Sequence, residues 1–94
     1  MNKATIDLTD CKSVFELHER IRIGLDFPEW YGKNWSAFWD LLHRDCEYDY
    51  ITVVGTNTVA EELKESIKIM QELMQKDKDY WENSKYPVDY EFVD

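Results

Sequence analysis

Basic residues are scarce in this sequence. Its 94 residues include 11 Lys and Arg against 20 Asp and Glu, which gives a net charge of −9 at neutral pH. Acids and bases occur in both halves, so the acidity belongs to the whole body rather than to a tail. Because phosphate binding needs clustered Lys and Arg, nucleic acid is disfavoured as a ligand. The charge favours a basic protein partner, and it is equally consistent with a role in solubility alone.

Cysteines and long apolar stretches are also few. Cys11 and Cys46 lack the CxxC or Cys/His spacing of a metal site or redox motif. We therefore expect two free thiols in a reducing compartment. The first ten residues contain no apolar run typical of a signal peptide, and no stretch approaches the roughly 18 apolar residues of a membrane helix. These absences predict a cytoplasmic protein without membrane association.

What the sequence does contain is an alternation of strand and helix patterns. Residues 4–8 and 88–93 alternate apolar and polar side chains, which is typical of strands with one buried face. Residues 50–54 form a nearly continuous apolar run, as expected of a central strand buried on both faces. Helical patterns separate the three strands. We therefore predict one α/β domain over residues 1–94, a three-stranded parallel sheet in the order 1-2-3 with helices packed on it.

Capping residues mark where two of the helices begin. Ser13 and Glu16 form a capping box before the first apolar helical pattern. Thr58 and Glu61 predict a second capping box, which opens a helix with an apolar side made of Leu63, Ile67, Met70 and Met74. A polar, aromatic segment over residues 76–87 is then expected to connect this helix to the last strand.

Residues 27–42, FPEWYGKNWSAFWDLL, hold three of the four tryptophans. Asn34 is a good N-cap for a helix that runs to about His43. One side of this helix has core spacing and carries Trp35, Phe38, Leu41 and Leu42. The other side carries Ser36, Trp39, Asp40 and His43, and a tryptophan beside an acid is unusual on a solvated face. Trp30 and Tyr31 lie in the preceding turn, where we expect both rings to project.

These residues resemble the barstar family, small intracellular inhibitors of bacterial ribonucleases. The segments LHERI, LDFPEWYGKN and AFWDLL match the first helix, the loop and the second helix of that family without a gap, and the match is close over residues 13–48. The resemblance implies the same three-stranded parallel sheet. It also implies that the second helix blocks the active site of a basic ribonuclease.

The resemblance further implies which residues contact the partner. Asp40 matches the acid that enters the phosphate-binding pocket of the ribonuclease, where a carboxylate can imitate a phosphate. Trp30 matches an aromatic residue that packs over the catalytic histidine, and Gly32 matches a residue that lets the loop approach closely. The remaining positions that we assign to partner binding are Tyr31, Asn34, Ser36, Trp39, Arg44, Asp45 and Glu72.

The sequence departs from the family at positions that concern the target. Ser36 replaces a second acid, and residues 43–48 differ from the small and aromatic residues of the family. Either one of Asp45, Glu47 and Asp49 replaces the missing charge, or the partner lacks the matching base. The family also uses a glutamate on its third helix, for which Glu72 is the nearest candidate.

Two functions from different classes remain open. The protein either inhibits a barnase-like ribonuclease or the ribonuclease domain of a toxin, as an immunity protein would, or it is a non-inhibitory domain that binds another basic protein. An enzyme is not expected, because nothing beside His18 or His43 supplies a nucleophile, an oxyanion hole or a metal cluster. Both histidines are predicted to be structural or at the surface. We expect no cofactor, and a monomer when the protein is free.

Overall fold

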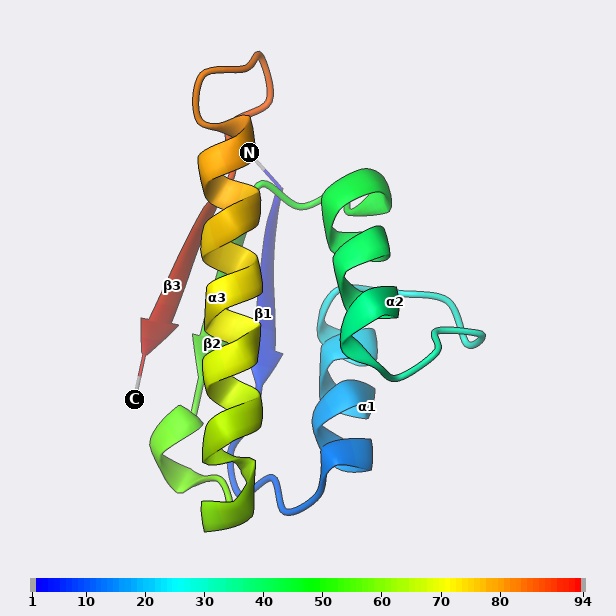
Figure 1. The fold of residues 1–94 in the computed structure, drawn as a ribbon, viewed down its shortest axis with the longest axis vertical. Coiled ribbons are helices and arrows are strands. Elements are labelled where there is room, and N and C mark those ends of the chain that lie inside the picture. Colours follow the sequence, from blue (N-terminus) through cyan, green and yellow to red (C-terminus); the bar gives the residue numbers. More distant parts are fainter. Residues whose placement is uncertain (1, 94) are drawn as a thin grey trace.

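The sheet of this protein is parallel and three-stranded, as the sequence predicts. The structure is a computed structural model that describes residues 2–93. Its strands are β1 (Lys3–Asp7), β2 (Tyr50–Val54) and β3 (Asp89–Val93), in the spatial order β1-β2-β3. Both neighbouring pairs are parallel, and helices pack against the sheet (Figure 1).

The connections between the strands are helical. They consist of α1 (Val14–Gly24), α2 (Trp35–Asp40), the π-helical turn η1 (Leu41–Asp45), the 3-10 turns η2 (Thr56–Thr58) and η3 (Glu61–Leu63), and α3 (Lys64–Trp81). The turn η1 continues α2 directly, so the predicted second helix ends two residues beyond His43. None of the helices within residues 2–93 combines the length and apolar character needed to cross a membrane.

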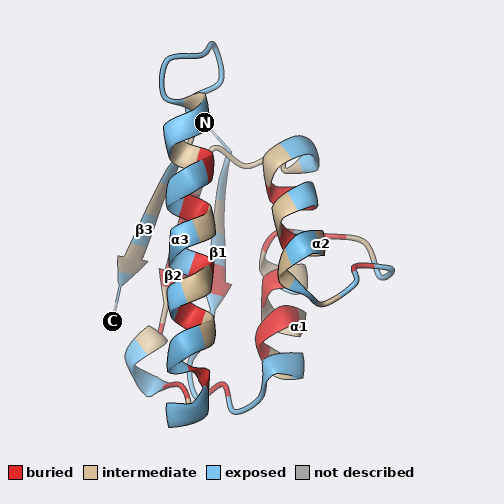
Figure 2. Ribbon diagram, viewed as in Figure 1, coloured by how far each residue is buried: buried red, intermediate tan, exposed pale blue. Residues whose placement is uncertain are grey.

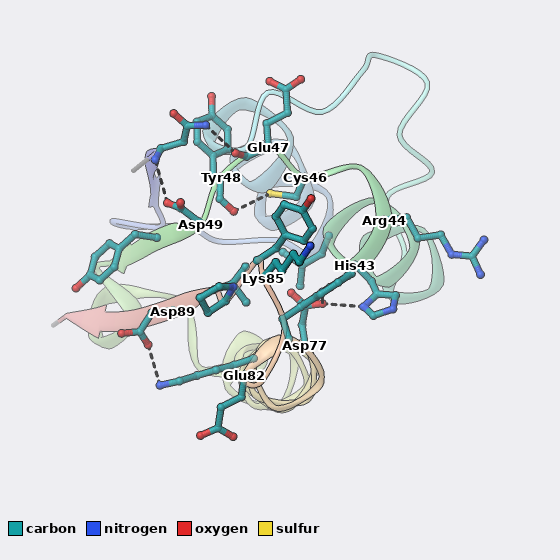
Figure 3. Close-up of a pocket in the computed structure, with 18 residues that line it drawn as sticks. His43, Arg44, Cys46, Glu47, Tyr48, Asp49, Asp77, Glu82, Lys85 and Asp89 are labelled. Atoms are coloured by element: carbon teal, nitrogen blue, oxygen red, sulfur yellow. Dashed lines mark hydrogen bonds and ion pairs between the residues drawn. The ribbon is translucent and has the colours of Figure 1, made fainter.

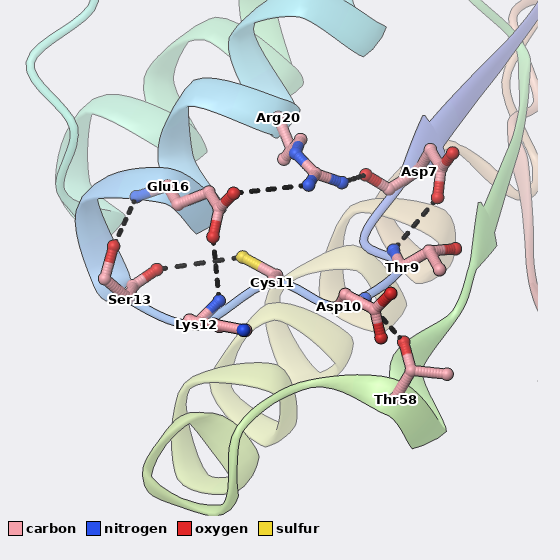
Figure 4. Close-up of polar contacts among 9 residues, drawn as sticks. All are labelled: Asp7, Thr9, Asp10, Cys11, Lys12, Ser13, Glu16, Arg20 and Thr58. Carbon is pink, nitrogen blue, oxygen red and sulfur yellow. Dashed lines mark hydrogen bonds and ion pairs between the residues drawn. The ribbon is translucent and has the colours of Figure 1, made fainter.

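The start of α1 confirms the predicted capping box. The hydroxyl of Ser13 accepts a hydrogen bond from the backbone N–H of Glu16 at 3.0 Å, and the Glu16 carboxylate accepts one from the N–H of Lys12 at 2.8 Å. The same carboxylate lies 3.2 Å from the guanidinium of Arg20, which donates to the carbonyl oxygen of Asp7 at 2.7 Å (Figure 4). The cap therefore ties the helix to the end of β1.

The end of α1 turns the chain sharply toward α2. Asp26 has a left-handed φ of +56°, and the N–H of Phe27 donates to the carbonyl of Arg22 at 2.9 Å, which is the pattern of a Schellman cap. Gly24, the last helical residue, packs directly on β1. A Cβ at this position would lie 2.7 Å from the carbonyl oxygen of Thr5, so only glycine allows this approach.

Strand β2 is covered on one face, not on both as the sequence suggested. Ile51 and Val53 are fully buried, whereas Tyr50, Thr52 and Val54 are only half-buried. The reason is topological. Right-handed crossovers that step in one direction across a sheet place their helices on the same face, so the order β1-β2-β3 leaves the opposite face open.

The start of α3 also differs from the prediction. Thr58 does not cap it: the Thr58 hydroxyl donates to the carbonyl of Gly55 at 2.7 Å and accepts from the N–H of Asp10 at 2.8 Å. Figure 4 shows this second contact, which joins the end of β2 to the end of β1. The helix itself begins only at Lys64, after η3, and no side chain of the described residues caps it.

At its other end α3 extends to Trp81, well into residues 76–87, which were expected to form a polar connection. Its buried side comprises Ile67, Met70, Met74 and Asp77. The last of these is an acid at a core position, so the apolar pattern stops in the sequence while the helix continues.

The core lies between the sheet and the helices (Figure 2). Its fully buried side chains include Ile6, Leu8, Leu17, Ile21, Phe38, Ile51, Val53, Met70 and Met74. Phe38, Leu41 and Leu42 are buried as predicted. Trp35 was expected to be buried with them but is half-buried, because its ring packs at the edge of the core.

Candidate partner-binding site

The loop of residues 26–34 and the helix α2 form one exposed surface. Most residues assigned to partner binding are exposed there or beside it: Trp30, Gly32, Asn34, Ser36, Asp40, Arg44, Asp45 and, on α3, Glu72. Trp39 is half-buried. Trp30 exposes 76% of its surface, more than any other large apolar side chain described. An indole this exposed is available for contact with another molecule without any rearrangement of the loop.

Asn34 fixes the junction between the loop and the helix. Its side-chain oxygen accepts from the N–H of Ala37 at 2.8 Å, which confirms the predicted N-cap, and its amide nitrogen donates to the carbonyl of Gly32 at 3.1 Å. A Cβ on Gly32 would lie 3.2 Å from that nitrogen. The glycine therefore makes room for the cap.

Tyr31 does not project from the loop, contrary to the prediction. It is 2% exposed, and its hydroxyl lies 2.7 Å from Nδ1 of His18. Its N–H donates to the carbonyl of Pro28, and this turn directs the ring inward, where it packs on Phe27 at 5.4 Å. Tyr31 therefore anchors the loop from below, while its neighbour Trp30 points outward.

The pair formed by His18 and Tyr31 is uncharged at neutral pH. Burial lowers the pKa of His18 below its ordinary value of 6.5, and the positive charge of Lys33 lowers it further. Burial also raises the pKa of the Tyr31 hydroxyl well above its ordinary value. His18 contacts α2 as well, because its ring centroid lies 4.5 Å from that of Trp35. One neutral imidazole thus supports both the loop and the first turn of the helix.

A buried carboxylate supports the other end of the surface. Asp77 is 1% exposed and accepts hydrogen bonds from Nδ1 of His43 at 2.8 Å, from Nε1 of Trp81 at 3.1 Å, and from the hydroxyl of Tyr90. Figure 3 shows the His43 ring turned toward this carboxylate. Burial, followed by this hydrogen bond, raises the pKa of Tyr90 well above its ordinary value, so its hydroxyl remains a donor. These donors offset the cost of burying a charge.

Trp39 contacts two side chains that orient its ring. Its ring stacks on His43 with centroids 4.7 Å apart and planes at 10°, and Nζ of Lys76 lies 4.7 Å from its centroid. Tyr80 packs on His43 in a T-shaped arrangement, with ring centroids 4.5 Å apart. The indole next to the exposed Asp40 therefore has a defined orientation.

The sequence pattern does not predict Lys76, Asp77 or Tyr80 at this site, because residues 76–87 have the polar and aromatic composition of a connecting segment. A signal was nevertheless present, since Asp77 follows Met74 at the three-residue spacing of a helix face. An acid at a buried helical position, close to two aromatic residues, is the pattern that would have identified the supporting network.

Two of the acids considered as replacements for the charge missing at Ser36 differ in exposure. Glu47 is exposed, whereas Asp49 is half-buried and accepts a hydrogen bond from the N–H of Asn2 at 2.9 Å. Asp49 thus has a structural partner already. Glu72 is exposed on α3, one helical turn before Lys76.

A pocket of about 850 Å³ opens beside this surface, where α3 ends and β2 and β3 begin (Figure 3). Cys46 lines it, and burial raises the pKa of this thiol above its ordinary value. Cys46 and the buried Cys11 are both free cysteines. Within residues 2–93, no group of three or more His, Cys, Asp or Glu side chains is placed to hold a metal ion.

The sequence was compared with known families and proteins. Residues 1–93 match the family described as Barstar (barnase inhibitor). The chain is also 43% identical, over 42 residues, to a protein of Bacillus subtilis (strain 168) described as "Putative ribonuclease inhibitor YrdF". That match covers 45% of this chain and 46% of the relative, so it spans about half of each. Because the family match extends over nearly the whole sequence, the chain belongs to the barstar family.

Proposed function

We propose that this protein inhibits a ribonuclease by covering its active site with the loop of residues 26–34 and helix α2. Membership of the barstar family and the description of the Bacillus relative support the inhibitory role. The observation that favours this surface is the position of Asp40, an exposed carboxylate on a helix supported at both ends. The exposed indole of Trp30 lies in the loop that leads into this helix.

Asp40 is suited to take the place of a phosphate group. A ribonuclease active site binds a polyanion, so it offers basic side chains that form charge-assisted hydrogen bonds to a carboxylate. Among the residues that the structure describes, Asp40 takes part in no ion pair, which leaves both oxygens available. The rigid support of α2 reduces the entropy lost on binding.

The rest of the molecule is consistent with such a partner. Trp30 provides apolar contact area that is already exposed before binding. The net charge of −9 steers a basic enzyme toward the inhibitor and accelerates association. The target in this proposal is a basic ribonuclease or the ribonuclease domain of a toxin, bound inside the cell that makes the inhibitor.

The proposal makes this protein an inhibitor and not an enzyme. Both histidines, the usual candidates for acid–base catalysis, already have partners within the chain. His18 pairs with Tyr31 in the core, and Nδ1 of His43 pairs with Asp77.

A second candidate is a barstar-fold domain that binds a basic protein without inhibiting it. Ser36 favours this alternative, because the family presents an acid at this position and Ser36 removes a charge that would face the enzyme. Inhibition and binding are separated by a direct assay of ribonuclease activity.

The assay uses the ribonuclease that co-purifies with this protein from the source organism, with and without equimolar inhibitor. Intact protein should abolish the activity. Asp40→Ala should weaken the complex by about 2–5 kcal/mol or more, a magnitude established on the barnase–barstar complex, because the basic groups of the enzyme lose their partner. Glu62→Ala makes the same change of charge at an exposed site on η3 and should inhibit like the intact protein. Unchanged activity with intact protein, or equal inhibition by Asp40→Ala, would leave the binding-domain alternative.

A further inference from the structure

One of the basic side chains on the surface proposed to bind ribonucleases lies against a tryptophan ring. Lys76 is exposed on α3, and its Nζ lies 4.7 Å from the centroid of the Trp39 ring. The face of an indole attracts a cation through its quadrupole. The ammonium group is therefore held next to the residue that precedes Asp40.

The ring that this ammonium group contacts is positioned from the core outward. Asp77 is buried and bonded to His43, and the His43 ring stacks on Trp39 with planes at 10°. Lys76 lies over the Trp39 ring in turn. This series of contacts links a buried charge to an exposed one and restricts where the exposed charge can go.

Lys76 differs from two other lysines in its ion pairing. In the part of the chain that the structure describes, Lys33 pairs with Glu19 and Lys78 pairs with Asp89, but Lys76 takes part in no ion pair. A partner that docks on α2 therefore meets a carboxylate at Asp40 and, over the ring of the preceding Trp39, an ammonium group with no ion-pair partner among the described residues.

We infer that Lys76 determines which ribonucleases this surface accepts. It disfavours an enzyme whose contact surface is basic throughout, and it favours one that presents a carboxylate beside the basic pocket for Asp40. The physical basis is repulsion between like charges in the first case and attraction in the second, and interfaces gain specificity from both. This inference rests on the proposed function, because it requires that α2 faces the enzyme.

Barnase, the ribonuclease named in the description of the family, serves as the probe. Lys76→Glu should increase the affinity for barnase at least about tenfold, because it replaces repulsion by attraction at a basic active site. Lys76→Gln removes the charge without reversing it, so its affinity for barnase should lie between that of the intact protein and that of Lys76→Glu. Lys64→Glu makes the same change of charge on the same helix, about 18 Å away along the axis, and should change the affinity by less than about threefold.

Two outcomes of this comparison would overturn the inference. Equal effects of Lys76→Glu and Lys64→Glu would show that only the net charge matters. Weaker binding of barnase by Lys76→Glu than by the intact protein would show that Lys76 does not meet a basic group of the enzyme.

A charge-reversal scan of barnase tests the preference for a carboxylate. Each exposed Lys or Arg of barnase is changed to Glu, and every variant is titrated with the intact inhibitor and with Lys76→Glu. At least one reversal should strengthen binding of the intact inhibitor and weaken binding of Lys76→Glu. If no reversal has opposite effects on the two inhibitors, Lys76 is not selective for an acidic group.

A double variant separates this inference from the proposed function. Asp40→Ala in the Lys76→Glu protein should lose most of the affinity for barnase. Binding that survives this change would contradict the proposed role of α2. A Lys76→Glu protein that gains no affinity contradicts only the selectivity of Lys76, since the role of Asp40 is tested independently on the co-purified enzyme.

Discussion

The two ends of the proposed binding helix rest on histidines that act in opposite ways. At the first turn of α2, His18 and the Tyr31 hydroxyl form an uncharged pair in the core. At the far end, His43 donates to the buried carboxylate of Asp77. The first support depends on a side chain that stays neutral, whereas the second depends on a charge whose hydrogen-bond donors must all be present.

This difference determines how each support can fail. Protonation of His18 would place a charge in an apolar environment, so the support at the loop is sensitive to pH. Removal of Asp77 would leave several buried donors without an acceptor, so the support near Trp39 is sensitive to the loss of one residue. Helix α2 is thus supported at one end by a contact that depends on pH, and at the other end by a network that depends on Asp77.

The largest expected effect is the removal of the buried carboxylate. Asp77→Ala should lower the free energy of unfolding by about 3–5 kcal/mol, because His43, Trp81 and Tyr90 lose their common acceptor. Urea denaturation measures this value. Asp79→Ala removes an exposed acid from the same helix and should stay within about 0.5 kcal/mol of the intact protein. Equal stability of the two variants would show that the network around Asp77 contributes nothing.

The neighbouring rings of the loop should separate binding from stability. Tyr31→Phe should lower the free energy of unfolding by about 1–3 kcal/mol, because it leaves the buried nitrogen of His18 without a partner. Trp30→Ala should leave stability within about 0.5 kcal/mol, since the ring is exposed, but should weaken the ribonuclease complex by more than about 1 kcal/mol. The binding effect should depend little on salt, because the lost contact is apolar. A Trp30→Ala protein that binds normally would remove the loop from the interface.

The smallest effect concerns pH. The pKa of His18 is lower in the folded protein than its ordinary value of 6.5, so the unfolded chain takes up the proton first and stability falls as the pH drops below about 6.5. His18→Gln should flatten this part of the profile. The pKa values of Glu16 and Glu19 are also lowered, but from an ordinary value of 4.5, so their contributions are lost only at more acidic pH. Thermal unfolding of the intact protein and of His18→Gln between pH 7.5 and about 5 measures how the stability of each depends on pH. If stability falls equally steeply in both proteins, His18 is not the source of the loss.

Features that depend on neighbouring residues could be predicted from the sequence. The cap at Ser13 needs only Glu16 three residues later, and the cap at Asn34 needs only the N–H of Ala37. The strand order followed from helices between strands and the rules of crossover. The resemblance of residues 13–48 to a known family then indicated which helix to regard as the site.

Features that depend on distant residues could not be predicted in this way. Trp30 and Tyr31 are adjacent aromatic residues, and the contacts that bury Tyr31 include one with His18, thirteen residues earlier in the chain. In the sequence, Asp77 interrupts the apolar pattern of the helix. Its burial cannot be predicted locally, because its donors include His43 on η1 and the hydroxyl of Tyr90 on β3. The half-exposed face of β2 resulted from the stepping direction of the crossovers, which the apolar run of residues 50–54 does not record.

Because the helices cover only one face of the sheet, the molecule has a helical side and an open sheet side. The helix layer carries the proposed contact surface, while Thr5, Thr52 and Glu91 lie in register on the uncovered side of the sheet. A complex formed through α2 would leave this open sheet side in solvent. A fluorophore, an affinity handle or a linker to a second protein could therefore be attached at Thr5 or Glu91 without obstructing the enzyme, which makes the open sheet side the natural place to hold this inhibitor while its helical side is occupied.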